Sequence, residues 1–352
     1  MPSVSQVTPA SAQRPLFLGF DVGGTGIKLG VVDDLGRALA QTRIDTLEEQ
    51  GPQSAVARAR TATNQMLTDL GLKIADLAAL GLATPGTMDI PKGIFLQPHN
   101  LPHWHYFPIR DCVAEAFSLP TTFANDANAA AYGEFWVGSG QKFHSIVMLT
   151  LGTGVGGGII IGDLSVDGEN SHGSECGHII IDSSPTARMC GCGQPGHLEA
   201  YCSATALVKR TTELLAGGRA SSLSQRVTPE TPLTAKMIDE EADKGDALAT
   251  EVIFELGTWL GLGCVTLMHC IDPGAIILGG AMNFGGADDP TGRRFLEHVR
   301  GVVRKHAFPI PAQRTVIDFA ALAGDAGFIG AAGIARLQYH RNRQPGSASA
   351  SK

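Results

Sequence analysis

The amino-acid sequence predicts an α/β protein built from two duplicated domains that meet at a cleft. A glycine-rich stretch, residues 24–32, reappears as residues 152–160 at a constant offset (152 minus 24, or 128 residues). An apolar run precedes each copy, at residues 16–20 and 146–151, and another follows it. Each copy therefore predicts two strands joined by a glycine turn. The 352 residues also provide enough material for two hydrophobic cores.

Other periodic segments predict that each strand pair belongs to a mixed sheet with packed helices. In the first half we expect strands at residues 37–44 and 77–83 and a helix at residues 53–70. In the second half we expect helices at residues 199–215, 247–270, 293–306 and 325–339, and strands at residues 275–278 and 315–320. The composition of residues 1–14 and 343–352 predicts a disordered tail at each end.

Composition and charge exclude several classes of function. The chain has 27 basic and 34 acidic residues, a net charge of -7 and no basic block, which argues against binding to nucleic acid or to an acidic membrane. No apolar run approaches the ~18 residues of a membrane span, and residues 1–15 lack the apolar core of a signal peptide. We therefore expect a soluble, cytoplasmic protein. The 44 glycines indicate many tight turns, which ligand-binding loops use.

The first glycine turn has the composition of a phosphate-binding loop. Backbone N–H groups, a hydroxyl group and a cation together suit a polyphosphate, and here they come from Gly23, Gly24, Thr25 and Lys28. A single glycine-rich hairpin is often no more than a turn, and that alternative stays open.

The second copy of the turn strengthens the phosphate interpretation. It contains Gly152, Thr153 and Gly154 between two apolar runs, as the first copy does. Because Gly156 stands where Lys28 stood, the two turns must have different tasks.

Asn125 and Asp126 follow a short apolar run and open an alanine-rich helix that extends to Phe135. In the simplest interpretation Asn125 caps the helix, an arrangement worth about 1 kcal/mol. In the functional interpretation Asp126 is a carboxylate at a strand-to-helix corner that accepts a proton from a substrate hydroxyl. The helix N-terminus would keep this carboxylate ionised at neutral pH, as a general base must be.

Residues 175–199 concentrate groups that can hold a metal ion. Four candidate ligands fall within twenty residues: His178, Cys190, Cys192 and His197. Thiolate and imidazole groups are usual ligands of zinc, and four protein ligands are typical of a closed structural site. The C-x-C spacing is tighter than the usual ligand pair, so a chance grouping on a surface loop stays the alternative. Four further cysteines are interpreted as core thiols: Cys112, Cys202, Cys264 and Cys270.

Taken together, these segments resemble the ROK family (repressors, open reading frames and sugar kinases). The resemblance extends from about residue 16 to residue 339 and is carried by residues 21–28, 125–126, 149–158, 175–178 and 190–199. It implies the actin-like, hexokinase-like (ribonuclease H-like) fold, with a duplicated domain and an interdomain cleft. We then expect a small N-terminal domain at residues 15–124 plus a closing helix at about 325–340, and a large C-terminal domain at residues 125–324 with a zinc-binding loop at 178–197.

The resemblance also implies a role for each candidate residue. Asp126 would be the general base, the two glycine turns would bind the phosphates of ATP, and Gly279 and Gly280 would lie against adenosine. Mg²⁺ would accompany ATP, and Zn²⁺ would be structural. The sugar hydroxyls would be bound by Asn125, Glu175, His178, Glu199, Asn100 and Gly86.

One position departs from the family pattern. The zinc site of the family has a third cysteine where this chain has His197. Imidazole is a competent substitute, so the resemblance implies a Cys2His2 site in place of Cys3His.

The family contains transcriptional repressors and kinases. The repressors carry a DNA-binding helix-turn-helix ahead of the first phosphate loop, whereas twenty residues precede Asp21 here, so we expect a kinase. The resemblance implies transfer of the γ-phosphate of ATP to the 6-hydroxyl of a hexose. Glucose is the first choice because Glu175, His178 and Glu199 are all present.

Alternatives to an ATP-dependent glucokinase stay open. They are a kinase for fructose, mannose or an N-acetylhexosamine, a glucokinase that uses polyphosphate, and a non-catalytic sugar-sensing regulator. We expect a homo-oligomer, a dimer or a tetramer, whose partners are the sugar and ATP, with neither nucleic acid nor membrane.

Overall fold

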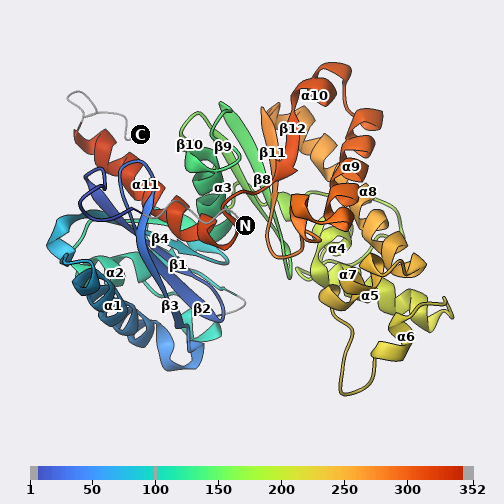
Figure 1. Cartoon of the computed structure of the whole chain (residues 1–352), viewed down its shortest axis with the longest axis horizontal. Helices are drawn as coiled ribbons and strands as arrows, with labels where there is room; N and C mark the ends of the chain where they lie inside the picture. Colours follow the sequence, from blue (N-terminus) through green and yellow to red (C-terminus); the bar gives the residue numbers. More distant parts are fainter. Residues whose placement is uncertain (1–6, 99–100, 344–352) are drawn as a thin grey trace. The chain divides into compact units, whose positions relative to one another are not determined.

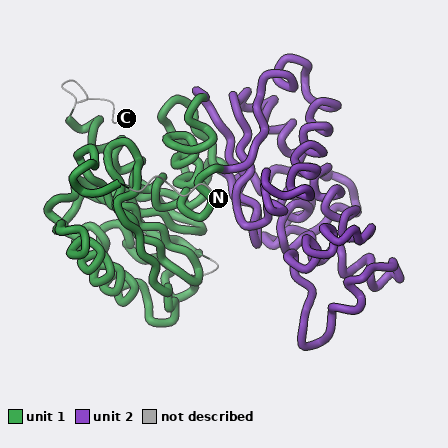
Figure 2. The backbone as a smooth tube through the Cα atoms, viewed as in Figure 1, with its two compact units in different colours: residues 1–142, 158–174, 321–352 green, residues 143–157, 175–320 purple. Residues whose placement is uncertain are grey.

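The computed structural model describes residues 7–98 and 101–343 of the chain. The chain separates into two compact units, which Figure 2 shows in different colours. Unit 1 comprises residues 1–142, 158–174 and 321–352, and unit 2 comprises residues 143–157 and 175–320. The chain therefore crosses between the units at four points.

Unit 1 contains a mixed sheet with the strand order β3-β2-β1-β4-β7 (Figure 1). The strands are β1 (Leu16–Val22), β2 (Gly26–Val32), β3 (Ala38–Asp45), β4 (Leu77–Thr84) and β7 (Thr121–Asn125). β2 is antiparallel to both β1 and β3, whereas β4 is parallel to both β1 and β7. The sequences of β1 and β4 are almost continuously apolar because the strands are buried on both faces of the sheet.

Two pairs of helices cover this sheet. α1 (Gly51–Asp69) and α2 (Ile109–Phe117) lie on one face, and α3 (Asp126–Val137) and α11 (Ala326–Arg343) lie on the other (Figure 1). The helix that closes unit 1 therefore comes from the far end of the sequence.

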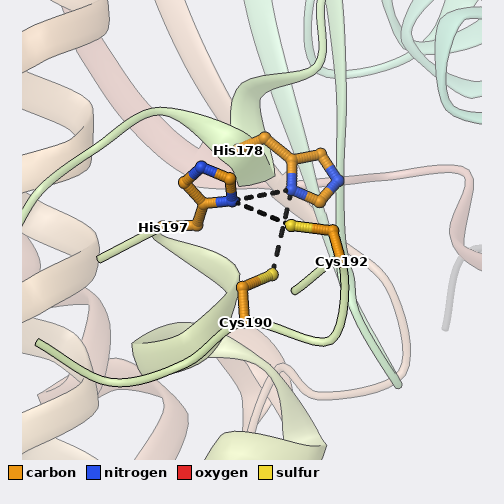
Figure 3. Close-up of side chains that lie close together, drawn as sticks. All are labelled: His178, Cys190, Cys192 and His197. Atoms are coloured by element: carbon orange, nitrogen blue, oxygen red, sulfur yellow. Dashed lines mark hydrogen bonds between the residues drawn. The ribbon is translucent and has the colours of Figure 1, made fainter. Parts of the chain in front are cut away.

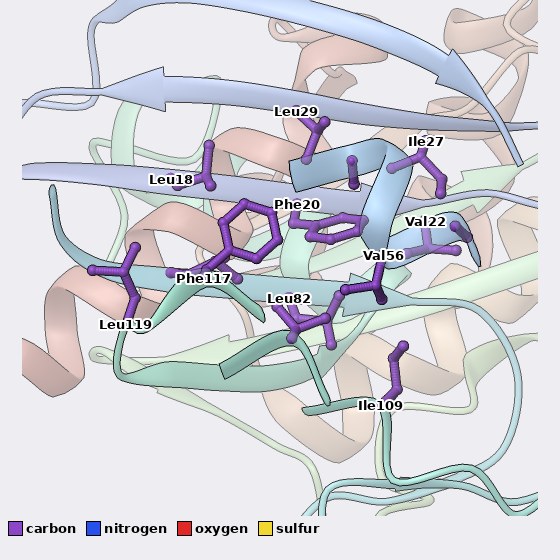
Figure 4. Close-up of a cluster of buried hydrophobic side chains, with 14 of the residues drawn as sticks. Leu18, Phe20, Val22, Ile27, Leu29, Val56, Leu82, Ile109, Phe117 and Leu119 are labelled. Atoms are coloured by element: carbon purple, nitrogen blue, oxygen red, sulfur yellow. The ribbon is translucent and has the colours of Figure 1, made fainter. Parts of the chain in front are cut away.

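Side chains of β1 alternate between the two faces. Leu18 and Phe20 belong to the same buried cluster as Val56 of α1 and Phe117 of α2 (Figure 4). Phe17 belongs to a second cluster, with Phe328 of α11. This alternation is the two-residue period of a strand, and it divides the core of unit 1 into two layers.

Glycines let α11 approach the backbone of the central strands. A Cβ atom at Gly19 of β1 would lie 1.9 Å from the carbonyl oxygen of Phe328, and one at Gly81 of β4 would lie 1.8 Å from that of Ala331. Both contacts are with main-chain atoms, which cannot rotate aside as a side chain can. Any larger residue at these two positions would push the helix away from the sheet.

A buried carboxylate fixes two loops of unit 1 to α3. Glu134 is fully buried, and its Oε2 accepts hydrogen bonds from the backbone N–H groups of Ser139 (2.8 Å) and Ala321 (3.1 Å). Its Oε1 accepts from the N–H of Leu322 (2.7 Å). Three main-chain donors thus compensate the cost of burying this group. Both loops lie next to points where the chain crosses between the units, after residue 142 and before residue 321.

The second sheet repeats the plan of the first, with the strand order β10-β9-β8-β11-β12. Its strands are β8 (Ser145–Leu151), β9 (Val155–Ile161), β10 (Leu164–Ser165), β11 (Ala275–Gly279) and β12 (Val316–Phe319). β11 is parallel to β8 and β12, as β4 is to β1 and β7. The two glycine turns thus occupy equivalent places, between β1 and β2 and between β8 and β9, which agrees with the predicted duplication.

Unit 2 is rich in helices around a long central one. They are α4 (Glu199–Cys202), α5 (Ala204–Ala216), α6 (Leu223–Arg226), α7 (Ala235–Asp243), α8 (Ala247–Ile271), α9 (Pro290–His306) and α10 (Pro309–Arg314). Among the described helices, α8 alone is long and apolar enough to span a membrane, with a mean hydropathy of 1.4. The sequence prediction was that no segment would be apolar enough over that length. Within the structure 61% of that window is buried, and α8 packs against α9 and α7 as a core helix does.

Short elements complete the chain. Two of them form the small antiparallel pair of β5 (Met88–Asp89) and β6 (Ile94–Phe95). The short 3-10 helices are η1 (Glu48–Gln50), η2 (Ile74–Asp76), η3 (Pro102–Trp104), η4 (Cys176–His178), η5 (Gly286–Asp288) and η6 (Ala323–Asp325).

Several elements differ from the sequence prediction. The helix expected at residues 199–215 is two helices, because Ser203 interrupts it and caps α5 by accepting a hydrogen bond from the N–H of Ala206 (3.1 Å). The short helices α2, α6, α7 and α10 had no predicted counterpart.

The expected N-terminal tail is wrong for residues 7–14. The N–H of Val7 donates to the carbonyl of Ala38 (3.0 Å), and the N–H of Gln13 donates to the carboxylate of Asp33 (3.0 Å). Residues 1–6 and 344–352 lie outside the described residues. At the C-terminal end α11 continues through Arg343, past the predicted end of the closing helix.

The division into units also differs from the predicted domains. Residues 125–142 and 158–174, expected in the large C-terminal domain, group with unit 1. The packing of α3 against α11 explains this for residues 125–142, since a Cβ atom at Gly330 of α11 would lie 1.6 Å from the carbonyl oxygen of Ala129 in α3. Residues 158–174 follow because Gly158 also packs on α3, where a Cβ atom would lie 2.8 Å from the carbonyl oxygen of Ala127.

Replacing Gly81 with alanine should lower the free energy of unfolding by about 1–3 kcal/mol, because the methyl group would clash with the carbonyl of Ala331. Urea unfolding of the purified variant measures this loss. Gly301→Ala in α9 is the control, because the added Cβ would meet only the flexible Arg304 side chain, at 3.8 Å. Alanine should be neutral there or stabilising by up to about 1 kcal/mol. Equal destabilisation by the two substitutions would contradict the packing argument.

Candidate active site

The first glycine turn is closed by two hydrogen bonds. The N–H of Gly23 donates to the carbonyl of Gly26 (2.9 Å), and the Thr46 hydroxyl donates to the carbonyl of Gly23 (2.7 Å). The candidate phosphate ligands Gly23, Gly24 and Thr25 therefore lie in one held turn between β1 and β2. Their contact with phosphate stays a prediction.

Lys28 of β2 binds another part of unit 1 in this structure. Its Nζ lies 2.6 Å from the carbonyl oxygen of Gly324 and 2.9 Å from Oδ1 of Asp325. The ion pair is partly exposed, with 27% and 21% of the two side chains accessible, so it contributes no more than about 1 kcal/mol. It joins the strand after the first turn to the segment that precedes α11.

Asn125 and Asp126 stand at the corner between β7 and α3. Oδ1 of Asn125 accepts hydrogen bonds from the N–H groups of Ala127 (2.9 Å) and Asn128 (3.4 Å), which confirms that Asn125 caps the helix. Asp126 is the first residue of α3, where the helix dipole favours a negative charge. Sugar binding by Asn125 stays a prediction.

A second carboxylate lies near Asp126. Burial and, to a smaller extent, the charge of Asp126 raise the pKa of Asp21, on β1, to about 7, although the charge of Lys28 opposes this rise. Asp21 pairs in register with Ala83, and Ala83 with Ala124, so the parallel strands bring Asp21 to the edge of the sheet where α3 begins. Asp21 belongs to the motif of residues 21–28, but no role for it was predicted from the sequence. An acid at the end of an apolar strand was the available signal.

The segment after β4 reaches the same edge of the sheet. β4 ends at Thr84, and Gly86 follows with a φ of +83°, a left-handed conformation that favours glycine. A Cβ atom at Gly86 would also lie 2.8 Å from Cα of Pro98. Asn100, the other weaker sugar-binding candidate, lies outside the described residues.

The second glycine turn is held by the start of α5. The N–H of Gly152 donates to the carbonyl of Gly154 (3.0 Å), and the N–H of Ala204 donates to the carbonyl of Gly152 (2.8 Å). The Thr205 hydroxyl donates to the carbonyl of Thr153 (2.8 Å). The turn is therefore fixed at both of its ends within unit 2.

Gly279 and Gly280 pass beside the end of β8. Gly280 has a φ of +91°, and a Cβ atom there would lie 2.2 Å from the carbonyl oxygen of Leu151. The N–H of Met282 donates to that same carbonyl (3.0 Å). A cavity of about 410 Å³ borders both this segment and the second turn, through Gly152, Thr153, Ala281 and Met282. Its size lies within the range of small-molecule sites.

The four candidate metal ligands come together in unit 2 (Figure 3). Their ligand atoms all lie within 4.8 Å of one another. Nδ1 of His197 lies 3.2 Å from Nδ1 of His178 and 3.2 Å from Sγ of Cys192, and Sγ of Cys190 lies 3.9 Å from Nδ1 of His178. His197 therefore takes its place in the cluster beside the other three residues.

The electrostatics of this cluster favour neutral imidazole. Burial lowers the pKa of His197, and the neighbouring His178 lowers it further, whereas Glu199 raises it. Neutral imidazole is the form that binds a metal ion.

Two acids flank the cluster. Oε2 of Glu175 lies 3.9 Å from Nε2 of His178. Glu199 connects the cluster to the second turn, because its Oε1 accepts from the thiol of Cys190 (3.3 Å) and its Oε2 from the N–H of Val155 (3.0 Å). The resemblance assigned Glu199 to the sugar, and this connection is a function that the sequence did not reveal.

The other cysteines follow the sequence expectation only in part. Cys202 and Cys264 are buried, as core thiols should be. Cys112 is half-buried, and Cys270 is exposed, since the end of α8 leaves its side chain at the surface. The core assignment of Cys270 is therefore wrong.

The candidate residues fall into two groups. Unit 1 holds the first glycine turn, Gly86, Asn125 and Asp126, and unit 2 holds the second turn, Gly279 and Gly280, the two acids and the metal cluster. Within each unit the structure brings together residues that are far apart in the sequence.

Comparison with known proteins gives consistent results. The model of the ROK family matches residues 17–338. A glucokinase from Halalkalibacterium halodurans is 31% identical over 322 residues, which cover 92% of this chain and 95% of that protein. The ROK hexokinase structure from Thermus thermophilus is 29% identical with a TM-score of 0.77, and the match covers 93% of this chain and 99% of that one.

A third match is the structure of a ROK family glucokinase from Streptomyces griseus in complex with glucose and AMPPNP. It is 32% identical with a TM-score of 0.72, and the match covers 92% of this chain and 100% of that one. These matches confirm the predicted actin-like, hexokinase-like α/β fold.

Proposed function

Because this chain belongs to the ROK family, we propose that it is an ATP-dependent hexose kinase that phosphorylates the 6-hydroxyl of glucose. One observation carries the proposal. Asp126 begins α3 at one edge of the sheet in unit 1, and Asp21 and the first glycine turn lie at the same edge. The names of the relatives, two glucokinases and a hexokinase, support the same class of reaction.

In this mechanism Asp126 accepts the proton of the sugar hydroxyl as that oxygen attacks the γ-phosphorus of ATP. The bond from this phosphorus to the oxygen that bridges it to the β-phosphate breaks, and ADP leaves with that oxygen. The helix N-terminus favours the charged form of the Asp126 carboxylate. Since the transition state of phosphoryl transfer is largely dissociative, orientation and neutralisation of charge contribute more than the strength of the base.

The donor binds through main-chain groups and a pocket in unit 2. The two glycine turns present N–H groups to the phosphates, and the cavity of about 410 Å³ beside Gly280 takes the nucleoside. Asp21 would hold Mg²⁺, which prefers carboxylate oxygens, and the ion would neutralise charge on the transferred phosphoryl group.

The sugar binds through hydrogen bonds to its hydroxyl groups. Asn125, Glu175, His178 and Glu199 form hydrogen bonds with the hydroxyl groups, and Gly86 is a weaker candidate for such a contact. A site built from such bonds rejects a sugar that lacks the matching hydroxyl, because its buried polar groups would be left unpaired.

The metal cluster fits a structural Zn²⁺ site. Ligand atoms about 2.0–2.3 Å from a zinc ion lie about 3.3–3.8 Å apart at tetrahedral angles. The observed separations of 3.2 and 3.9 Å are close to these values. We assign His178, Cys190, Cys192 and His197 as the four ligands, which leave no open position for catalysis. The ion would fix the loop that leads into Glu199.

We further place the reaction in the cytoplasm and expect the protein to act as a homo-oligomer. Neither statement affects the roles given to the site residues.

Assays of sugar phosphate formation should give the highest kcat/KM for glucose when ATP is the donor. The panel includes fructose, mannose and an N-acetylhexosamine, each with ATP and with polyphosphate. A preference for another hexose or for polyphosphate would redirect the assignment of substrate. Sugar binding with no turnover on any pair would replace the kinase by a sugar-sensing regulator.

Asp126→Asn should reduce kcat by about 10²–10⁴-fold, because the amide cannot accept the hydroxyl proton. Calorimetry should still detect sugar binding by the variant. Asp111→Asn is the matched control, since Asp111 is also an acid in the first turn of a helix of unit 1 but its side chain is 64% exposed. Near wild-type turnover by Asp126→Asn would remove Asp126 from the role of base.

Purified protein should contain about one zinc ion per chain by elemental analysis, and Cys192→Ser should contain far less, because it removes one of four ligands. Cys270→Ser, a substitution of an exposed cysteine outside the cluster, should leave the zinc content unchanged. A zinc content near zero in active wild-type enzyme would refute the structural site.

A further inference from the structure

Asp239 of α7 carries a carboxyl oxygen that stands out in unit 2. Its Oδ1 is buried and has no hydrogen-bond partner among the described residues. An unpaired buried polar atom is rare in a folded protein and calls for an explanation, such as a ligand that supplies the missing donor.

The neighbouring carboxylates, in contrast, are all satisfied. Asp243 accepts a hydrogen bond from the Thr291 hydroxyl (2.6 Å), Asp289 accepts from the N–H of Thr291 (2.7 Å), and Glu240 accepts from Arg226 (2.7 Å). Burial, together with the charges of Asp243, Asp289 and Glu240, raises the pKa of Asp239 to about 6. Asp239 is still mostly ionised at neutral pH, so it offers acceptors that the surrounding protein does not use.

Asp239 is one of the residues that line the cavity of about 410 Å³ beside the second glycine turn. Gly152 and Thr153 supply main-chain groups on the wall of this cavity, and Met282 and Phe284 supply apolar surface. A nucleotide has the corresponding parts, namely phosphates, a flat base, and a ribose with two adjacent hydroxyl donors.

We propose that Asp239 binds the ribose hydroxyls of the phosphoryl donor and thereby selects a ribonucleotide. Two neighbouring hydroxyls match the two oxygens of one carboxylate, and dinucleotide-binding folds also use an acidic residue to bind a ribose hydroxyl. The base is a weaker partner for the Asp239 carboxylate than the ribose, because apolar side chains such as Met282 and Phe284 line the same cavity and suit the flat faces of the base. This inference rests on the proposed use of ATP and adds a specificity-determining residue to it.

The test compares ATP with 2′-deoxy-ATP and 3′-deoxy-ATP in wild type, Asp239→Asn and Asp239→Ala. Wild type should bind ATP about tenfold or more tightly than at least one deoxynucleotide, measured by calorimetry and as KM. In both variants ATP binding should weaken by a similar factor while deoxynucleotide binding changes little. The ratio of the affinity for ATP to the affinity for the deoxynucleotide should therefore approach one. The kcat at saturating donor should change much less than KM.

The matched control is Glu240→Gln, on the same helix but outside the cavity, which should keep the wild-type ratio. Thermal unfolding of each variant shows whether it is folded. An unchanged ATP to deoxy-ATP ratio in a folded Asp239→Ala would overturn this inference alone and leave the kinase intact. A second outcome would also overturn it. If Asp239→Ala no longer distinguished ATP from inosine triphosphate but still distinguished ATP from deoxy-ATP, the contact of Asp239 would be with the base and not with the ribose. Failure of the wild type to bind ATP at all would overturn both proposals.

Discussion

Main-chain contact between α11 and the central strands of unit 1 positions most of the chemistry in that unit. α11 lies so close to β1 and β4 that glycine is required at Gly19 and Gly81. The same helix places Gly327 beside Asp21, where a Cβ atom would lie 2.2 Å from Oδ2 of the carboxyl group. The segment just before it provides both partners of Lys28. A shift of this helix would therefore disturb Asp21 and Lys28 together.

The environment of Asp126 depends on this arrangement. Asp21 is buried near Asp126, and two carboxylates in such proximity oppose ionisation of each other. The positive charge of Lys28 offsets part of this effect, and the helix N-terminus favours the charged form of Asp126. The balance among these groups follows from the register of parallel strands, which brings the ends of β1, β4 and β7 to one edge.

Local motifs of the sequence were sufficient to predict much of the fold and part of the candidate site. The repeated glycine turn revealed the duplication because both copies are continuous in sequence, and the metal cluster was visible because its residues fall between His178 and His197. The sequence could not reveal that Glu134 binds Ala321 and Leu322, which are 187 and 188 residues away. It also gave no sign of Asp239, since α7 is a short helix whose importance comes from the cavity that it borders.

The crossing of the chain between the units has a consequence for the order in which the protein is synthesised. In many proteins the N-terminal domain folds on the ribosome while the rest of the chain is still being made. Here the first sheet contains residues from Leu16 onward, but α11, which covers one of its faces together with α3, begins only at Ala326. The apolar side chains of that face that pack on α11 include Phe17, Val32 and Ala79. They therefore stay exposed until almost the whole chain has left the ribosome. Nascent unit 1 would depend on chaperones during this interval, and a chain that ends before α11 would expose this face permanently.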